Sequence, residues 1–99
     1  MDKIKSFESY LLDEFEIDGH HFVPKKAIDI TVEYDDSLWI LSLPYIDAVG
    51  YSNDYSEAED LLHDYLEEQW TEYVLCPQED LGETGMLMRE MLLELFEVS

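Results

Sequence analysis

The chain has 99 residues, a length that fits one domain and is too short for two. Its 25 acidic side chains outnumber 5 Lys and Arg, which gives a formal net charge of −20 at pH 7. This balance argues against binding DNA, RNA or an anionic membrane through a basic surface. Hydrophobic residues make up 46% of the chain, which predicts a domain with a core rather than a disordered acidic segment.

Apolar residues recur at helical spacing in the first part of the chain. They are Ile4, Phe7, Leu11 and Phe15. This spacing predicts a helix over residues 3–16, and we expect Asp18-Gly19 to end it. Residues 19–26, which contain the pair His20-His21, are then expected to form a link to the next element.

After this link the hydrophobic period changes from 3.6 to 2. Apolar and polar residues alternate from Ile28 to Tyr34, which predicts a strand with one buried face. The turn cluster Asp35-Asp36-Ser37 precedes a second strand that Pro44 ends, and a short third strand is expected over residues 48–52. Because the connections are short, we expect an antiparallel β-meander over residues 28–52.

Two helices are expected in the rest of the chain. Asp54 with Glu57 three residues later is a variant of the capping box and predicts a helix over residues 54–75. A loop with Pro77 follows, and a last helix is expected over residues 84–97. The predicted order is therefore α-β-β-β-α-α: a single α+β domain, residues 1–99, in which helices pack on a short three-stranded antiparallel sheet.

Residues 30–66 contain a distinctive series of features. A strand leads to the acidic turn at Asp35-Asp36, and an aromatic-bearing strand ends at Pro44. A loop and a short strand follow, and then a helix begins at the cap Asp54 with Glu57-Ala58 behind it. This series resembles the HicB antitoxin family. The resemblance implies a partial ribonuclease-H-like β-β-β-α unit in a protein that binds and covers a small basic ribonuclease toxin.

The chain departs from that family pattern in two places. Tyr45-Ile46-Asp47 stands where the family usually has a loop containing Gly, and the acidic residues 77–99 stand where the family has a DNA-binding segment. Residues 1–24 are additional to the family pattern.

Acidic residues follow one stripe of the long predicted helix at i, i+3 and i+4 spacing. They are Glu57, Asp60, Asp64, Glu67 and Glu68. One interpretation is a solvated face that keeps the protein soluble. The other is a negative surface that binds a basic partner, with successive carboxylates about 5–6 Å apart, close to the spacing of nucleic-acid phosphates.

Aromatic residues lie near the predicted start of this stripe. Tyr51 and Tyr55 flank the third strand and the helix start, where they could serve as interface anchors, since aromatic residues are enriched in binding hot spots. The adjacent pair His20-His21 is far in sequence from His63 and Cys76, so we expect no metal site.

The absence of enzyme motifs guides the functional hypotheses. The chain has no Gly-rich phosphate loop, no GxSxG, no HExxH and no CxxC, so we expect a protein that is not an enzyme and uses no cofactor. Cys76 is the single cysteine, which excludes an internal disulfide. No apolar run approaches the ~20 residues of a membrane helix, and we expect a cytoplasmic protein without a membrane partner.

Three functions remain open at this point. The first is an inhibitor that masks the basic surface of a nuclease or nucleic-acid-binding protein, in the manner of a HicB-like antitoxin. The second is a nucleic-acid mimic of the anti-CRISPR or anti-restriction type, encoded by a phage and acting in the infected cell. The third is an interaction module that forms a homodimer through its C-terminal helix, where Met86, Met88 and Met91 cluster.

Overall fold

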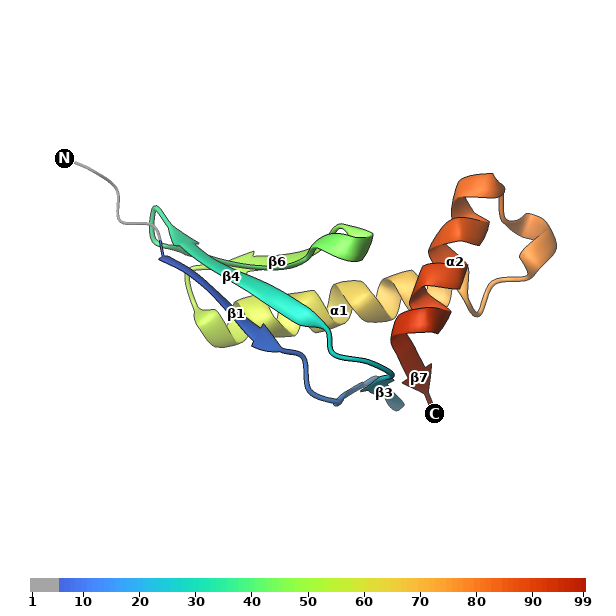
Figure 1. Ribbon diagram of the computed structural model, residues 1–99, viewed down its shortest axis with the longest axis horizontal. Helices are drawn as coiled ribbons and strands as arrows, with labels where there is room; N and C mark the ends of the chain where they lie inside the picture. The colour runs from blue at the N-terminus through green and yellow to red at the C-terminus, as the bar shows by residue number, and fades with distance from the viewer. Residues whose placement is uncertain (1–5) are drawn as a thin grey trace.

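Residues 6–99 are described by a computed structural model of the chain, shown in Figure 1. They form an α+β fold with two antiparallel sheets and two α-helices. The four-stranded sheet has the order β1-β4-β5-β6 and comprises β1 (Ser6–Leu11), β4 (Asp29–Asp35), β5 (Leu38–Leu43) and β6 (Ala48–Ser52). The three-stranded sheet has the order β2-β3-β7 and comprises β2 (Phe15–Ile17), β3 (His20–Pro24) and β7 (Phe96–Val98).

The helices are α1 (Tyr55–Tyr73) and α2 (Glu83–Leu95), and the 3₁₀ turns η1 (Pro44–Ile46) and η2 (Gln78–Asp80) lie in connections. Within the described residues neither helix combines the length and the apolar character needed to cross a membrane. The β-meander expected over residues 28–52 corresponds to β4, β5 and β6, and the helix expected from residue 54 corresponds to α1.

The helix expected over residues 3–16 is wrong for the described part of that range, and residues 3–5, with Ile4, lie outside it. Residues 6–11 form β1, which pairs antiparallel with β4 from Ser6↔Tyr34 to Leu11↔Asp29. Burial alternates at the end of this strand, because Leu12 is buried whereas Leu11 is 59% exposed. Long-range pairing with β4 therefore overrides the local helical spacing.

The sequence Asp18-Gly19 does not end a helix, because it forms the turn of the β2–β3 hairpin. Both residues have positive φ, 50° and 82°, and Ile17 pairs directly with His20. A two-residue loop with this geometry is a type I′ turn, for which Asp-Gly is a preferred sequence. Asp36-Ser37, with φ of 56° and 69°, makes the equivalent turn between β4 and β5.

The link expected over residues 19–26 contains β3, and the helix expected over 84–97 ends early because β7 pairs with β3. Aromatic packing explains this second sheet: the rings of Phe15 and Phe22 are stacked at 4.9 Å, and Phe96 meets Phe22 edge-on at 5.6 Å. The predicted order α-β-β-β-α-α and the single three-stranded sheet are therefore wrong. Phe15 and Phe22 belong to one hairpin, whereas Phe96 is far from both in sequence. The packing of Phe96 on Phe22 is therefore a tertiary contact, which the local spacing of residues does not predict.

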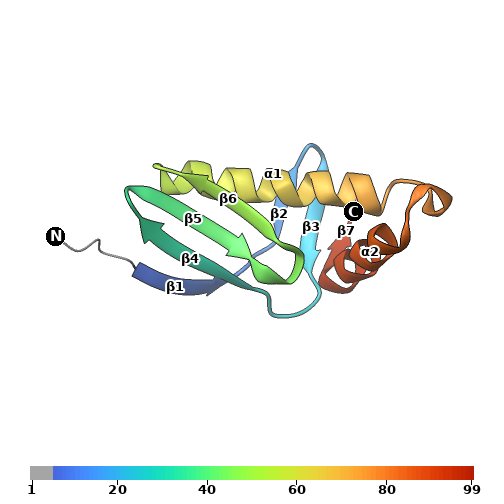
Figure 2. The same cartoon turned by 90° about the horizontal axis from the view of Figure 1, so that it is seen from above.

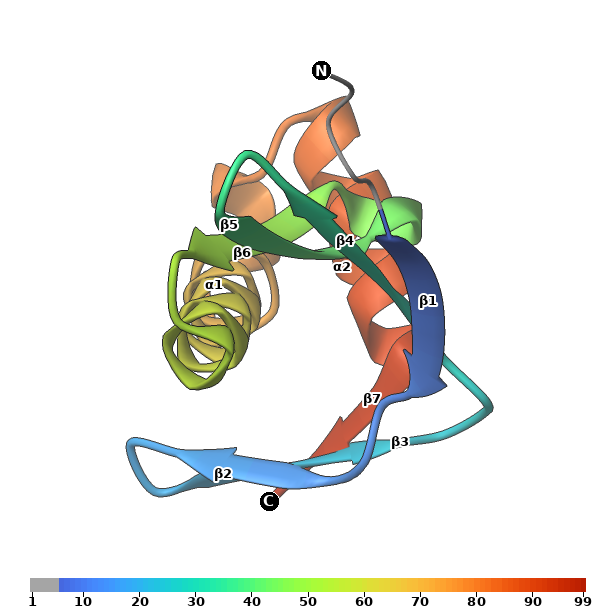
Figure 3. The ribbon, with the colours of Figure 1, turned by 90° about the vertical axis from the view of Figure 1, so that its left-hand side faces the viewer.

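Helix α1 lies between the two sheets, as Figure 3 shows. Its start is capped by Asp54, whose carboxylate accepts from the backbone N–H of Ser56 at 2.9 Å and of Glu57 at 3.4 Å. The buried residues of α1 recur every four positions and thus form one stripe. They are Ala58, Leu62, Leu66 and Trp70.

Strand β6 contacts α1 most closely at Gly50. A Cβ atom at this position would collide with the carbonyl oxygen of Ala58 and the backbone nitrogen of Leu62, and would lie 2.9 Å from the Leu62 Cα. Glycine is thus required at position 50 because the backbone of β6 approaches the backbone of α1 too closely for any side chain to fit between them. The contact sets the distance between β6 and α1.

We predict that Gly50→Ala destabilises the protein by about 3 kcal/mol, the upper end of what overpacking a core costs, because α1 must move away from the sheet. Urea unfolding measures this loss. Gly82→Ala is the matched control, since a Cβ there meets nothing within 4 Å, and we expect it to cost less than about 1 kcal/mol. Equal stabilities of the two variants would contradict the close contact.

Candidate protein-binding site

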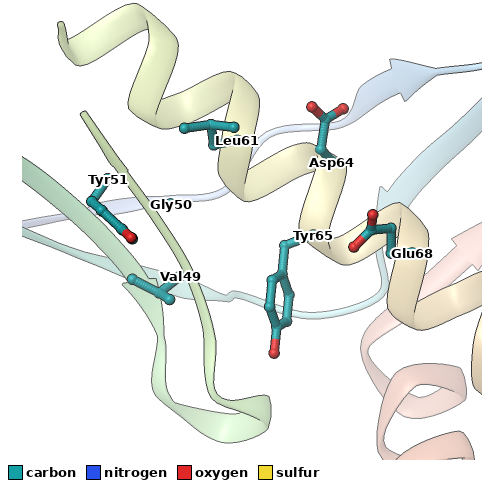
Figure 4. Close-up of a pocket in the computed structure, with 7 residues that line it drawn as sticks. All are labelled: Val49, Gly50, Tyr51, Leu61, Asp64, Tyr65 and Glu68. Carbon is teal, nitrogen blue, oxygen red and sulfur yellow. The ribbon is translucent and has the colours of Figure 1, made fainter.

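An open groove of about 460 Å³ lies between β6 and α1. Strand β6 is an edge strand of the four-stranded sheet. Helix α1 runs along the β6 edge of that sheet, as Figure 2 shows. Residues of both elements line the groove and are drawn in Figure 4. They are Val49, Gly50, Tyr51, Leu61, Asp64, Tyr65 and Glu68.

Apolar side chains line much of this groove. Leu61 and Tyr65 come from α1, whereas Val49 and Tyr51 come from β6 (Figure 4). Tyr51 is 59% exposed and Leu61 is 42% exposed, so both offer apolar surface to a partner. Tyrosine is one of the residue types enriched in binding hot spots, which makes Tyr51 the better anchor of the two.

Two carboxylates lie on the α1 side of the groove. Asp64 and Glu68 are one helical turn apart and both are exposed (Figure 4). Neither forms a hydrogen bond or salt bridge with another residue in the described range 6–99. The groove therefore combines an apolar surface with negative charge that hydrogen bonds within the fold do not engage.

The structure divides the predicted acidic stripe. Of its five members, Asp64 and Glu68 lie in the groove, together with Tyr51. Asp60 is exposed on α1 but does not line the groove.

The other predicted residues have partners inside the fold. The Glu57 carboxylate accepts a hydrogen bond from the Ser52 hydroxyl at the start of α1. Glu67 accepts from the Thr71 hydroxyl at 3.0 Å and lies 3.5 Å from Nδ1 of His20 in β3. These carboxylates help to hold the fold, which makes them weaker candidates for partner contact.

Tyr55 lies away from the groove, and its ring meets that of Trp39 edge-on at 5.2 Å. Leu61 and Tyr65 line the groove but are not among the partner residues predicted from the sequence. The sequence contains a weak signal for these groove residues. The apolar face of the helix includes Leu61, Tyr65 and Tyr73 and is broader than one sheet can cover, so part of it is expected to remain exposed.

The described cations are all engaged elsewhere in the molecule. Lys25 donates to the carbonyl of Leu93 at 2.8 Å, and Lys26 pairs with Glu94 at 3.0 Å. Arg89 donates to the carbonyl of Val74 at 2.8 Å, at the C-terminal cap of α1. In the described part of the chain no Lys or Arg lines the groove.

A second cavity, of about 350 Å³, lies against another face of α1 beside β1. In it the Tyr10 hydroxyl donates to Glu59 at 3.4 Å, and burial, with the nearby Glu59 charge, raises the pKa of Tyr10. His63 stacks on Phe15 with ring centroids 4.1 Å apart. Burial lowers the pKa of His63, while the charges of Glu59, Asp60 and Asp64 oppose that shift.

Within residues 6–99 no group of three or more His, Cys, Asp or Glu side chains is arranged to hold a metal ion. Met88 and Met91, on which a dimer of C-terminal helices would depend, are partly buried against the protein's own core. The exposed apolar and acidic residues of the β6–α1 groove are thus the strongest candidates for partner contact.

No family model, curated protein or solved structure matches this chain.

We predict that His63 makes the fold less stable as pH falls below about 6.5, its ordinary pKa. Because its folded-state pKa is lowered, the unfolded chain binds the proton more tightly, and stability declines until pH passes below the folded-state value. Urea unfolding from pH 8 to pH 5 should show a steeper decline for the wild type than for His63→Gln. Parallel curves for the two proteins would contradict the partly buried position of His63.

Proposed function

We propose that the protein is a non-enzymatic inhibitor that binds a basic partner protein through the β6–α1 groove and the adjoining acidic face of α1. The observation that carries this proposal is the negative charge of Asp60, Asp64 and Glu68, which are exposed on α1 while the described cations are engaged elsewhere. Binding would cover the partner's nucleic-acid-binding or active-site surface.

The size of the charge favours this function over solvation alone. A net charge of about 2–8 keeps a small domain soluble, whereas this chain carries −20. Such a surplus costs stability through self-repulsion, and a basic partner would relieve that repulsion on binding. The charge would also speed association with the partner and make the affinity depend on salt.

The class of partner is a small nuclease or another nucleic-acid-binding protein, since such proteins carry basic surfaces for phosphates. The order β4-β5-β6-α1 supports an antitoxin role, because it is the β-β-β-α order that the HicB resemblance implies. Such an inhibitor would act in the cytoplasm of a bacterium, or of an infected cell if a phage encodes it.

We predict that Asp60→Lys/Asp64→Lys weakens partner binding at least about 10-fold, equivalent to 1.4 kcal/mol, without unfolding the domain. Glu79→Lys/Asp80→Lys is the matched control: it makes the same change in net charge in η2, outside the groove, and should bind as the wild type does. The three proteins serve as baits for a source-cell lysate, with elution in steps of increasing salt. The nuclease activity of the captured protein is then assayed with and without added wild-type protein.

The expected result is a basic nuclease that the wild type and the control retain and inhibit, and that the Asp60/Asp64 variant loses. Equal retention by all three baits would contradict the proposal, since charge alone would then explain binding. Capture of a large ribonucleoprotein or restriction complex would instead favour the anti-CRISPR or anti-restriction type of mimic.

A further inference from the structure

Strand β6 is an open edge beside a surface of suitable chemistry. It is the last strand in the order β1-β4-β5-β6, so one side of its five residues has no neighbouring strand within the sheet. Alternate residues of an edge strand direct their N–H and C=O groups outward, where another strand can pair with them. β1, β2 and β7 are also edges; β2 and β7 have three residues each, and short edges pair poorly. β1 has six residues, but the groove lined by Leu61, Asp64, Tyr65 and Glu68 adjoins β6 and not β1.

An added strand would lie in the groove described above. Paired strands are separated by about 4.8 Å, which would place the added strand next to β6 on the side where α1 runs along the sheet (Figure 2). There its side chains would meet Leu61 and Tyr65 on one face. Asp64 and Glu68 would lie within reach of its longer side chains.

The charge of the groove identifies the kind of strand that fits. A second copy of this chain would bring another net charge of −20 against Asp64 and Glu68, and like charges across an interface oppose association. A segment with Lys or Arg would instead pair with these carboxylates, and its apolar residues would cover the exposed Leu61 and Tyr51.

We propose that the β6 edge receives an extended, Lys- or Arg-bearing segment of the partner protein, which continues the four-stranded sheet as a fifth strand next to β6. This proposal rests on the proposed function, since it specifies how the same face engages its basic partner. Backbone hydrogen bonds to β6 would hold the segment, and Asp64 and Glu68 would select for its charge.

The test uses a nine-residue peptide of alternating Lys and Val, acetylated and amidated at its ends. Two derivatives carry N-methyl groups on either all Val or all Lys residues, which removes the backbone donors of one strand edge and leaves the charge unchanged. Affinities are measured by fluorescence anisotropy at low salt. Amide chemical shifts of the protein, recorded by NMR, locate the contact.

We expect one methylated peptide to bind at least about 10-fold more weakly than the other, because a single edge of the added strand faces β6. The amide shifts should be largest in residues 48–52. Asp64→Lys/Glu68→Lys should bind the unmethylated peptide at least about 10-fold more weakly than Glu79→Lys/Asp80→Lys, which has the same net charge.

Equal affinities of the two methylated peptides, or unchanged shifts in residues 48–52, would overturn strand pairing. If the Asp64/Glu68 variant still loses binding in that case, the acidic face remains the contact and the proposed function stands. If both charge variants bind equally, the proposed function fails as well. Concentration-dependent shifts of residues 48–52 without peptide would show that a second copy occupies the edge, which also overturns this proposal.

Discussion

The close approach of α1 to β6 is the constraint on which the rest of the structure depends. Gly50 allows the backbones of the strand and the helix to meet at Ala58 and Leu62, so α1 lies directly against the edge of the four-stranded sheet. Further along α1 the same buried stripe reaches the second sheet, where Trp70 meets Phe22 edge-on at 5.7 Å. The same approach leaves Leu61 and Tyr65 beside the β6 edge, and this placement creates the groove.

Charge is distributed in a way that agrees with this arrangement. Lys25 and Arg89 donate to carbonyls at the ends of α2 and α1, where positive charge stabilises a helix C-terminus. Of the described cations, two bind carbonyl groups at helix ends and the third, Lys26, forms a surface ion pair with Glu94. None of the three lines the groove. The remaining negative charge on α1 is therefore available to a partner from outside, which is the physical basis of the proposed inhibitor.

The parts of the fold that sequence could predict are those with local signals. Alternation from Ile28 to Tyr34 and the cap at Asp54 identify the meander and α1. The helical spacing of Phe7, Leu11 and Phe15 was misleading, because the packing of Phe15 on Phe22 depends on contacts distant in sequence. For the site, Asp64, Glu68 and Tyr51 were predicted as partner residues, but the open side of β6 that brings them together depends on strand order, which residue spacing alone does not specify.

The most direct test of the account is amide hydrogen exchange of the protein alone and in complex with its captured basic partner. If the β6–α1 groove is the binding face, protection should increase in residues 48–52 and 61–68 and should not change in α2. Increased protection confined to α2 or to the β2–β3 hairpin, with the groove unchanged, would contradict the account and place the interface elsewhere.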